Sequence, residues 1–522
     1  MSQQSPTAAD QTPDVDGYLS HRQILVVMGG LMAGMFLAAL DQSIVGTALP
    51  RITSELGGLN KLSWVVTAYL LTQTASTPLW GKISDLYGRK LIFQAAIVIF
   101  LVGSLLSGMS ESIGMLIAFR AVQGLGGGGL FALALATMGD IVPPRERGKY
   151  GGYFGAVFGT SSVLGPLLGG FFTDGPGWRW IFYINIPIGI AALVITSSAL
   201  KMKHVRREHT IDYLGATAIV AGVSSFLLYT SWVGPDYGWG SALGMVFIAA
   251  GVLLTAAFIF IESRAAEPII PLELFKISVF RTSNIYSFIL GFAMFGAIVF
   301  LPVYLQVVHG YSPTKSGLAF LPMVIGIFTT SISSGILMSK TGRYKVFPIL
   351  GSLTVVVALL LLSTLTVGSP YWQAAIWFWM FGAGLGFSMQ IVVTIVQNAV
   401  DRRHMGTATS SVAFFRSMGG TFGAAVFGAI LTARLTAHLG GSGSAINSSD
   451  TSNVSKIQQL PPGIKAFVLQ AFADSLHDVF LWAIPVVMVA FVVSLFIREL
   501  PLKARQGETE EVTEPEEIAL TT

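Results

Sequence analysis

Three charged side chains, Asp41, Arg120 and Arg416, lie inside long apolar stretches of the sequence, where a charge is costly. Removal from water favours the neutral form of a carboxylate, so Asp41 is a candidate for binding a proton or a cation. Its alternative role is that of a structural hydrogen-bond acceptor. Arg120 keeps its charge and could bind an anion, change the proton affinity of a nearby carboxylate, or extend toward water. For Arg416, a functional role and a role in helix packing are equally open.

A short charged segment, Gly81–Lys90, joins two of the apolar stretches and reads GKISDLYGRK. Its glycines, Gly81 and Gly88, allow a tight turn. Asp85 can pair with Arg89 or with a group at a neighbouring helix end. An ion pair that forms in one conformation and breaks in another would act as a gate. Lys90, at the end of the segment, is a further candidate residue of this gate. The alternative is an ordinary polar loop, which residue order alone does not exclude.

Polar side chains within the apolar stretches are candidates for the lining of a cavity. Gln123 lies three positions after Arg120 and therefore shares its helix face. A cavity that accepts varied apolar molecules needs aromatic and Met surfaces with few polar groups, and the chain has 17 Met. The candidate lining residues are Gln123, Tyr304, Gln306, Gln390, Gln397, Asn398 and Arg416.

The composition excludes several classes of protein. Hydrophobic residues make up 53% and charged residues 11% of the 522 residues, whereas a soluble protein carries roughly a quarter charged residues. The chain has no Cys, which excludes disulfides, thiolate metal sites and Cys nucleophiles. A net charge of +4 leaves no footprint for nucleic-acid binding. The Gly-rich run 126–129 matches neither a phosphate-binding loop nor a dinucleotide fingerprint, so we expect no enzymatic activity, cofactor or metal.

Fourteen apolar stretches have about the length that crosses a bilayer, which predicts an all-α integral membrane protein embedded in the lipid bilayer. Most of the 31 Lys and Arg residues then fall in the N-terminal and C-terminal segments and in every second connection, as is typical of the cytoplasmic side. We therefore expect both termini in the cytoplasm; counts of thirteen or fifteen are less favoured. The stretches lie near residues 23–48, 60–80, 91–110, 113–137, 150–173, 179–200, 212–233, 241–262, 282–306, 316–338, 346–367, 371–397, 406–433 and 478–497.

An internal repeat predicts two equivalent halves, as in many transport proteins. The repeated residues, all at one offset, are Gly81 and Gly335, Gly88 and Gly342, Arg89 and Arg343, Gly165 and Gly419, and Gly169 and Gly423. We expect a cytoplasmic N-terminal tail (1–22), a six-helix bundle (23–200), a linker with an inserted helix hairpin (201–280), a second six-helix bundle (281–498) with an external loop (436–475), and a cytoplasmic acidic tail (499–522).

Five motifs resemble those of one transporter family, and the resemblance extends over about residues 23–500. Gly81–Lys90 resembles the signature loop of the major facilitator superfamily. Leu40–Pro50 (LDQSIVGTALP) resembles the first-helix motif of its fourteen-helix drug:proton antiporter family, and Arg120–Gly126 (RAVQGLG) is similar to the fourth-helix motif. The residues Gly165, Pro166, Gly169 and Gly170 resemble the fifth-helix antiporter motif. Trp178–Gly189 (WRWIFYINIPIG) resembles the loop and sixth-helix pattern.

The resemblance implies a proton-coupled secondary antiporter that exports small lipophilic or amphipathic compounds by alternating access. It implies that Arg120 takes part in proton coupling, for which Asp41 is the candidate carboxylate. Small residues in the stretch 150–173 would form a tightly packed seam suited to rocking of two bundles. Its partners would be a small-molecule substrate and protons, in the cell membrane of a bacterium, with the monomer as the functional unit. The alternative is a dedicated exporter or facilitator of one native metabolite, lipid or peptide-like molecule; a channel or scaffold is a third class.

Overall fold

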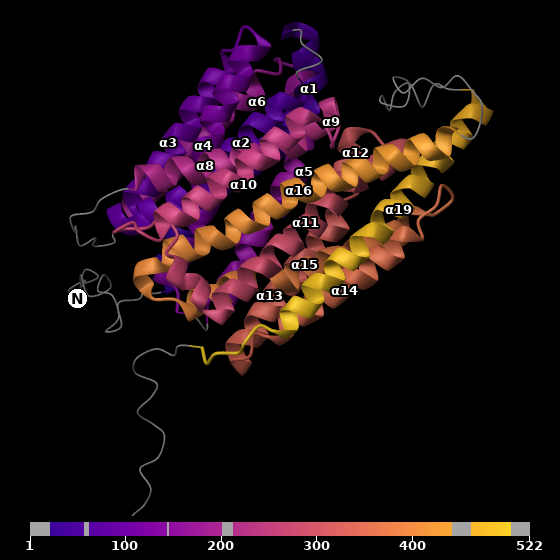
Figure 1. The fold of residues 1–522 in the computed structure, drawn as a ribbon. Coiled ribbons are helices and arrows are strands. Elements are labelled where there is room, and N and C mark those ends of the chain that lie inside the picture. Colours follow the sequence, from indigo (N-terminus) through magenta and orange to yellow (C-terminus); the bar gives the residue numbers. More distant parts are fainter. Residues whose placement is uncertain (1–20, 57–61, 144–145, 201–211, 441–460, 503–522) are drawn as a thin grey trace, which may run out of the picture.

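The computed structural model describes residues 21–56, 62–143, 146–200, 212–440 and 461–502 (Figure 1). All regular structure in these ranges is helical, so the predicted all-α fold class is confirmed for them. Twelve helical segments of the described residues are long and apolar enough to cross a bilayer. The helices α2 (Leu62–Tyr87) and α11 (Ser278–Val307) lie outside these twelve, although they have 26 and 30 residues and cover two further predicted spans.

The first half of the chain packs its helices around α4 and α1. Helices α2 and α3 lie against α4, while α5 and α7 lie against α1. Because most of these helices are apolar all round, they bury a core on one side and face outward with apolar side chains on the other. The remaining helices of this half are α1 (His21–Leu56), α3 (Arg89–Gly108), α4 (Ile113–Ile141), α5 (Arg147–Asp174), α6 (Trp180–Tyr183) and α7 (Asn185–Ala199).

The second half uses the same set of helix pairs. Helices α13 and α14 lie against α15, while α16 and α19 lie against α11, as α5 and α7 lie against α1. The matched glycines occupy matched places, since Gly165 of α5 packs on Ser43 of α1 and Gly419 of α16 packs on the carbonyl of Phe288 in α11. The helices are α12 (Pro313–Leu318), α13 (Leu321–Thr341), α14 (Val346–Ser363), α15 (Tyr371–Ala399), α16 (Met405–Gly440) and α19 (Pro462–Leu495).

Between the halves, the chain forms a helix hairpin of α8 (Tyr213–Leu228) and α10 (Ala242–Glu262), joined through a π-turn and the short α9 (Gly234–Tyr237). Helix α8 packs on α10 and on α2, so the hairpin lies along the flank of the first half (Figure 1). The aromatic ring of Phe226 in α8 packs against that of Phe422 in α16, and the two ring centroids lie 6.3 Å apart. The hairpin therefore contacts both halves.

The two halves meet through α5 against α13 and α2 against α16. In Figure 1 the orange and yellow helices α16 and α19 slant away from the first half toward the upper right. Side-chain hydrogen bonds between described residues of the two halves gather at the opposite end, where Asp85 and Gln397 reach across. The halves are thus tied at one end.

The predicted external loop 436–475 is partly helical. Helix α16 extends to Gly440 and α19 begins at Pro462, so both ends of the predicted loop 436–475 continue the helices. Residues 441–460 lie outside the described part of the chain, as do most of the two predicted tails. The start of the predicted C-terminal tail packs on the second half, because Glu499 accepts a hydrogen bond from the backbone N–H of Tyr344 at 3.1 Å. The Tyr344 hydroxyl also donates to the carbonyl of Arg498, the last residue of the predicted second bundle, at 3.0 Å.

Candidate functional site

Four side chains from three helices form a buried cluster, the polar centre: Asp41, Arg120, Gln123 and Asn185. Arg120 Nη1 lies 2.5 Å from Asp41 Oδ2 and also donates to Gln123 Oε1 at 2.8 Å. Gln123 Nε2 donates to Asp41 Oδ1 at 2.9 Å, and Asn185 Nδ2 to the same oxygen at 3.2 Å. All four residues are at most 1% exposed. The carboxylate predicted to need a partner therefore has three donors.

The surroundings of the polar centre hold Arg120 in place. Its Nε donates to the carbonyl of Val65 at 3.3 Å, and its guanidinium lies 4.2 Å from the centre of the Tyr69 ring. Asn185 also donates to Ser104 Oγ at 3.0 Å, which adds α3 to the helices joined here. Removing one member of a buried ion pair leaves an uncompensated charge and costs about 3–5 kcal/mol, so the charge state of Asp41 bears directly on this packing.

Two adjacent cavities lie next to the polar centre. The central cavity, of about 310 Å³, lies between the halves and is lined by residues of both. The vestibule, of about 1070 Å³, follows α16 from Ser417 to Ala433 and is lined on its other side by Arg120, Tyr69 and the hairpin. That stretch of α16 is about 24 Å long and leads away from the tied end of the halves. The two cavities share the wall residues Gln42, Gln73 and Ser417.

The cavity walls contain residues that the sequence analysis did not single out. Gln42 follows Asp41 directly and donates to Gln73 Oε1 at 3.1 Å, so these two amides stand between the polar centre and the open space. Gln73 is a polar side chain inside an apolar stretch, the signal that identified Gln390. The Met count had suggested an adaptable apolar surface, and four Met side chains form it: Met35, Met294, Met323 and Met389.

Of the predicted lining residues, Arg416 and Gln390 line the central cavity. Gln123 belongs to the polar centre instead, because its side-chain amide donates to Asp41 of α1. The other predicted lining residues do not line either cavity. Tyr304 donates to the carbonyl of Thr366 at 3.0 Å, Gln397 to that of Leu135 at 3.0 Å, Asn398 to that of Pro501 at 3.1 Å, and Gln306 is partly exposed outside both cavities.

The segment Gly81–Lys90 is almost entirely helical rather than a loop, which corrects the prediction. Helix α2 runs to Tyr87 and α3 begins at Arg89, so only Gly88 separates them. Gly88 has φ 93°, a left-handed conformation that favours glycine, as does Gly342 with φ 71° at the end of α13. Gly81 serves a different purpose than a turn. A side chain there would collide with Ser410 on α16, so it permits the two helices to touch.

Asp85 joins the two halves at this segment. Its Oδ1 accepts from the backbone N–H of Gly406 at 2.9 Å, and its Oδ2 from the N–H of Thr407 at 2.8 Å. Arg89 Nη2 lies 2.7 Å from Asp85 Oδ1, which is the predicted pair, and Arg89 Nε lies 2.6 Å from Asp140 Oδ2. We call Asp85, Arg89 and the start of α16 the interhelical latch. Lys90 lies outside it, because its Nζ donates to the carbonyl of Ser197 at 2.6 Å within the first half.

The small residues of α5 face two different neighbours. Gly151, Gly155 and Gly159 face the second half, where Gln390, Ile327 and Val324 are their nearest side chains. The later motif Gly165, Pro166, Gly169 and Gly170 lies toward the other end of α5, and its Gly165 packs on Ser43 of α1 inside the first half. The seam between the halves is therefore the earlier glycine run, and the motif itself helps to pack α5 on α1.

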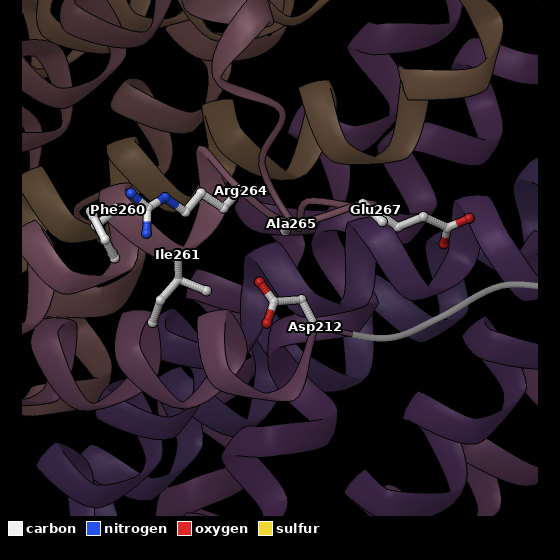
Figure 2. A pocket seen from close by; sticks show the side chains of 7 residues that line it. Asp212, Phe260, Ile261, Arg264, Ala265 and Glu267 are labelled. Atoms are coloured by element: carbon white, nitrogen blue, oxygen red, sulfur yellow. The ribbon is translucent and has the colours of Figure 1, made fainter.

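A third pocket of about 370 Å³ lies at the base of the hairpin and is open at the protein surface (Figure 2). Its charged side chains point in different directions and not toward one common point. Figure 2 shows Arg264 extending toward Phe260, whose ring centre lies 4.0 Å from the guanidinium, while Glu267 extends the opposite way. In the described ranges, no group of three or more His, Asp or Glu side chains could hold a metal ion. The chemistry of the described residues thus concentrates at the polar centre and its cavities.

Known proteins resemble this chain over most of its length. The sequence profile of the Major Facilitator Superfamily matches residues 31–215 and 209–424. An uncharacterized MFS-type transporter of Mycobacterium tuberculosis is 41% identical over 479 residues, which are 91% of this chain and 70% of the relative. Multidrug resistance protein 3 of Bacillus subtilis is 36% identical over 502 residues, 93% of this chain and 97% of the relative. Multidrug transporter protein MdtP of the same organism is 34% identical over 528 residues, 96% and 97% of the two chains.

Solved structures share the fold. The proton:xylose symporter XylE superposes with a TM-score of 0.61 at 14% identity, covering 93% of this chain and 98% of that one. The human organic anion transporter MFSD10 gives a TM-score of 0.60 at 14% identity, covering 89% and 99%. Because these two proteins carry different cargo on one fold, the fold does not identify a substrate. The profile match and the relatives identify the family: this chain is a membrane transporter of the Major Facilitator Superfamily, not an enzyme, and is related to multidrug efflux pumps.

Proposed function

We propose that the protein is a proton-coupled antiporter that exports small lipophilic or amphipathic compounds by alternating access. The observation that carries the proposal is the buried ion pair of Asp41 and Arg120, at 2.5 Å, beside a cavity that Arg120 itself lines. A proton-binding carboxylate needs a partner whose contact changes with its charge, together with a route to water. The polar centre supplies the partner and the vestibule supplies the route.

Coupling would follow from the charge of Asp41. Protonation of this side chain removes the counter-charge of Arg120, which then has to find water or an anion in the vestibule. The contact that joins α1 to α4 weakens at the same time. Since Gln42 adjoins Asp41 on α1 and lines both cavities, a shift of α1 reaches the space that holds the cargo. Proton binding and cargo binding would thus act on one helix.

Alternating access would use the interhelical latch and the glycine seam. We place the latch on the cytoplasmic side, with both termini in the cytoplasm and fourteen spans in all. In this arrangement the cytoplasmic end is closed by Asp85 and the start of α16, and the vestibule leads toward the outside, where protons enter. The small residues Gly151, Gly155 and Gly159 let α5 and α13 slide on one another with little steric hindrance. The functional unit in this proposal is the monomer.

The cargo class rests on the cavity wall and on the relatives. Four Met side chains and the aromatic rings of Phe131 and Phe154 give the central cavity a polarizable apolar surface. Such walls can repack around different molecules. Two Bacillus subtilis relatives that match 93% or more of this chain bear multidrug names, which supports export of several unrelated compounds.

The test is transport by the full chain in proteoliposomes under an imposed pH gradient, with substrate-stimulated proton movement as the readout. Asp41→Asn is expected to keep cargo binding and to lose gradient-driven transport by at least about ten-fold, because the amide binds no proton. Asp401→Asn, on a side chain 72% exposed, is the matched control and should transport normally. Full gradient-driven transport by Asp41→Asn would show the assignment to be wrong. A panel of unrelated dyes separates the alternative, since a dedicated exporter of one metabolite would carry few of them.

A further inference from the structure

Arg416 differs from the other arginines in the interior of the protein. It lines the central cavity and is partly exposed to it, yet it has no ion-pair or hydrogen-bond partner among the described residues. Its backbone is held firmly, because a side chain at Gly291 of α11 would collide with the Arg416 carbonyl. The other interior arginines are all engaged: Arg89 by Asp85 and Asp140, Arg120 by Asp41, and Arg147 by the carbonyls of Gly139 and Val142.

The cavity around Arg416 offers no negative charge. No Asp or Glu is among the residues that line the central cavity or the vestibule, and Asp41 is fully buried against Arg120. A second donor on the same wall also lacks an acceptor, because Gln390 Nε2 is buried without a hydrogen-bond partner in the described part of the chain. The wall therefore has one amide donor without an acceptor and one uncompensated positive charge. A guanidinium in such low-dielectric surroundings is stabilised when an anion binds to it.

We propose that the preferred cargo is an amphipathic organic anion, an apolar body with one carboxylate group, and that the carboxylate binds Arg416. The planar guanidinium presents parallel N–H donors that match the two oxygens of a carboxylate. The Met and Phe side chains of the central cavity would cover the apolar body, and the volume of about 310 Å³ suits a small molecule. Lipophilic cations would be repelled by the unpaired positive charge of Arg416 and should bind less tightly. This inference rests on the proposed export function and narrows its substrate class.

The test uses three fluorescent probes with one apolar body: pyrenebutyrate, pyrenebutyramide and pyrenebutylamine. Binding to the purified full chain is measured by energy transfer from its 10 Trp residues, with protein-free micelles as the blank. The carboxylate is expected to bind at least about ten-fold more tightly than the amide, and the amine most weakly. Arg416→Gln should bring the carboxylate to within about two-fold of the amide while leaving the amide affinity unchanged, and Arg416→Lys should keep part of the preference.

Arg403→Gln removes one positive charge from a side chain 76% exposed and is the matched control, which should keep the full preference. The unchanged affinity for the amide reports that each variant is folded. Equal binding of carboxylate and amide by the unmodified chain, or a preference that survives in Arg416→Gln, would overturn the proposal. Asp41→Asn separates this inference from the proposed function. It should keep the carboxylate preference even though it loses gradient-driven transport.

Discussion

Asp85 at the end of α2 caps the start of α16 through Thr407, accepting from its backbone N–H at 2.8 Å and from its hydroxyl at 2.9 Å. The first backbone N–H groups of a helix have no partner within the helix and carry a partial positive charge, so a carboxylate is well suited to them. Because the carboxylate belongs to one half and the helix to the other, this cap ties the halves together. The latch therefore depends on one acid and a helix terminus.

Asp85→Asn is expected to weaken the latch. The neutral amide keeps some hydrogen bonding but loses the attraction to the helix terminus and to Arg89, at a cost of about 1–2 kcal/mol, or roughly five- to thirty-fold in the population of the closed end. Since the chain has no Cys, a label pair at Tyr87→Cys and Arg403→Cys can report the distance across this end without background. Glu111→Asn, exposed near the start of α4, is the control and should leave the distance distribution unchanged. An unaltered distribution in Asp85→Asn would contradict the role of the cap.

Gly81→Val is expected to open the same end by a different physical cause. A side chain at this position meets Ser410 and the carbonyl of Gly406 on α16, so the helices can close only by moving apart. The same label pair should show a longer distance, and transport should fall because one of the two alternating states is lost. Gly29→Val in α1 is the matched control, since nothing lies within 4 Å of an added side chain there. Comparable effects of both variants would point to a general helix defect instead.

Asp41 and Arg120 should show strong energetic coupling. Either Asp41→Asn or Arg120→Gln leaves a buried polar group without its counter-charge, and the loss of one ionic partner costs about 3–5 kcal/mol. The double variant removes both charges and should unfold at a higher temperature than Asp41→Asn alone, because no unpaired guanidinium remains. Thermal unfolding of the four purified proteins in one detergent measures this cycle. Additive losses would mean that the pair is not a stabilising unit.

His404 should make the latch sensitive to acid. Burial lowers the pKa of His404 from its ordinary value of 6.5, and Arg403 adds to the shift, while Asp85 opposes it. A histidine with a lowered pKa is neutral in the folded protein, so its contribution to stability is complete above pH 6.5 and is lost as the pH falls below that value. The unfolding temperature should therefore drop less between pH 7.5 and 5.5 in His404→Asn than in the unmodified chain. An equal drop in His404→Asn and in the unmodified chain would contradict this prediction.

Local patterns were enough to predict the helices and the family. Apolar stretches of sufficient length form helices wherever they lie, because a helix satisfies its own backbone hydrogen bonds in lipid. The structure has a helical segment at each of the fourteen predicted stretches. Local patterns gave the wrong secondary structure where a charged segment lies between two apolar stretches. Gly81–Lys90 was predicted as a loop because it is polar, but neighbouring helices supply partners for its charges and the helix continues.

The sequence by itself determined that Asp41, Arg120 and Arg416 need partners or water, because the cost of a charge in an apolar segment depends only on its immediate surroundings. Only the tertiary structure decided which partner each one has. Asp41 and Arg120 pair because α1 and α4 pack side by side, and the amide of Gln123 donates to Asp41 instead of lining a cavity. Arg416 has the same chemistry as Arg120, but α16 presents it to open space where no carboxylate reaches. Contacts between helices distant in sequence depend on packing of the whole bundle, and no local pattern contains them.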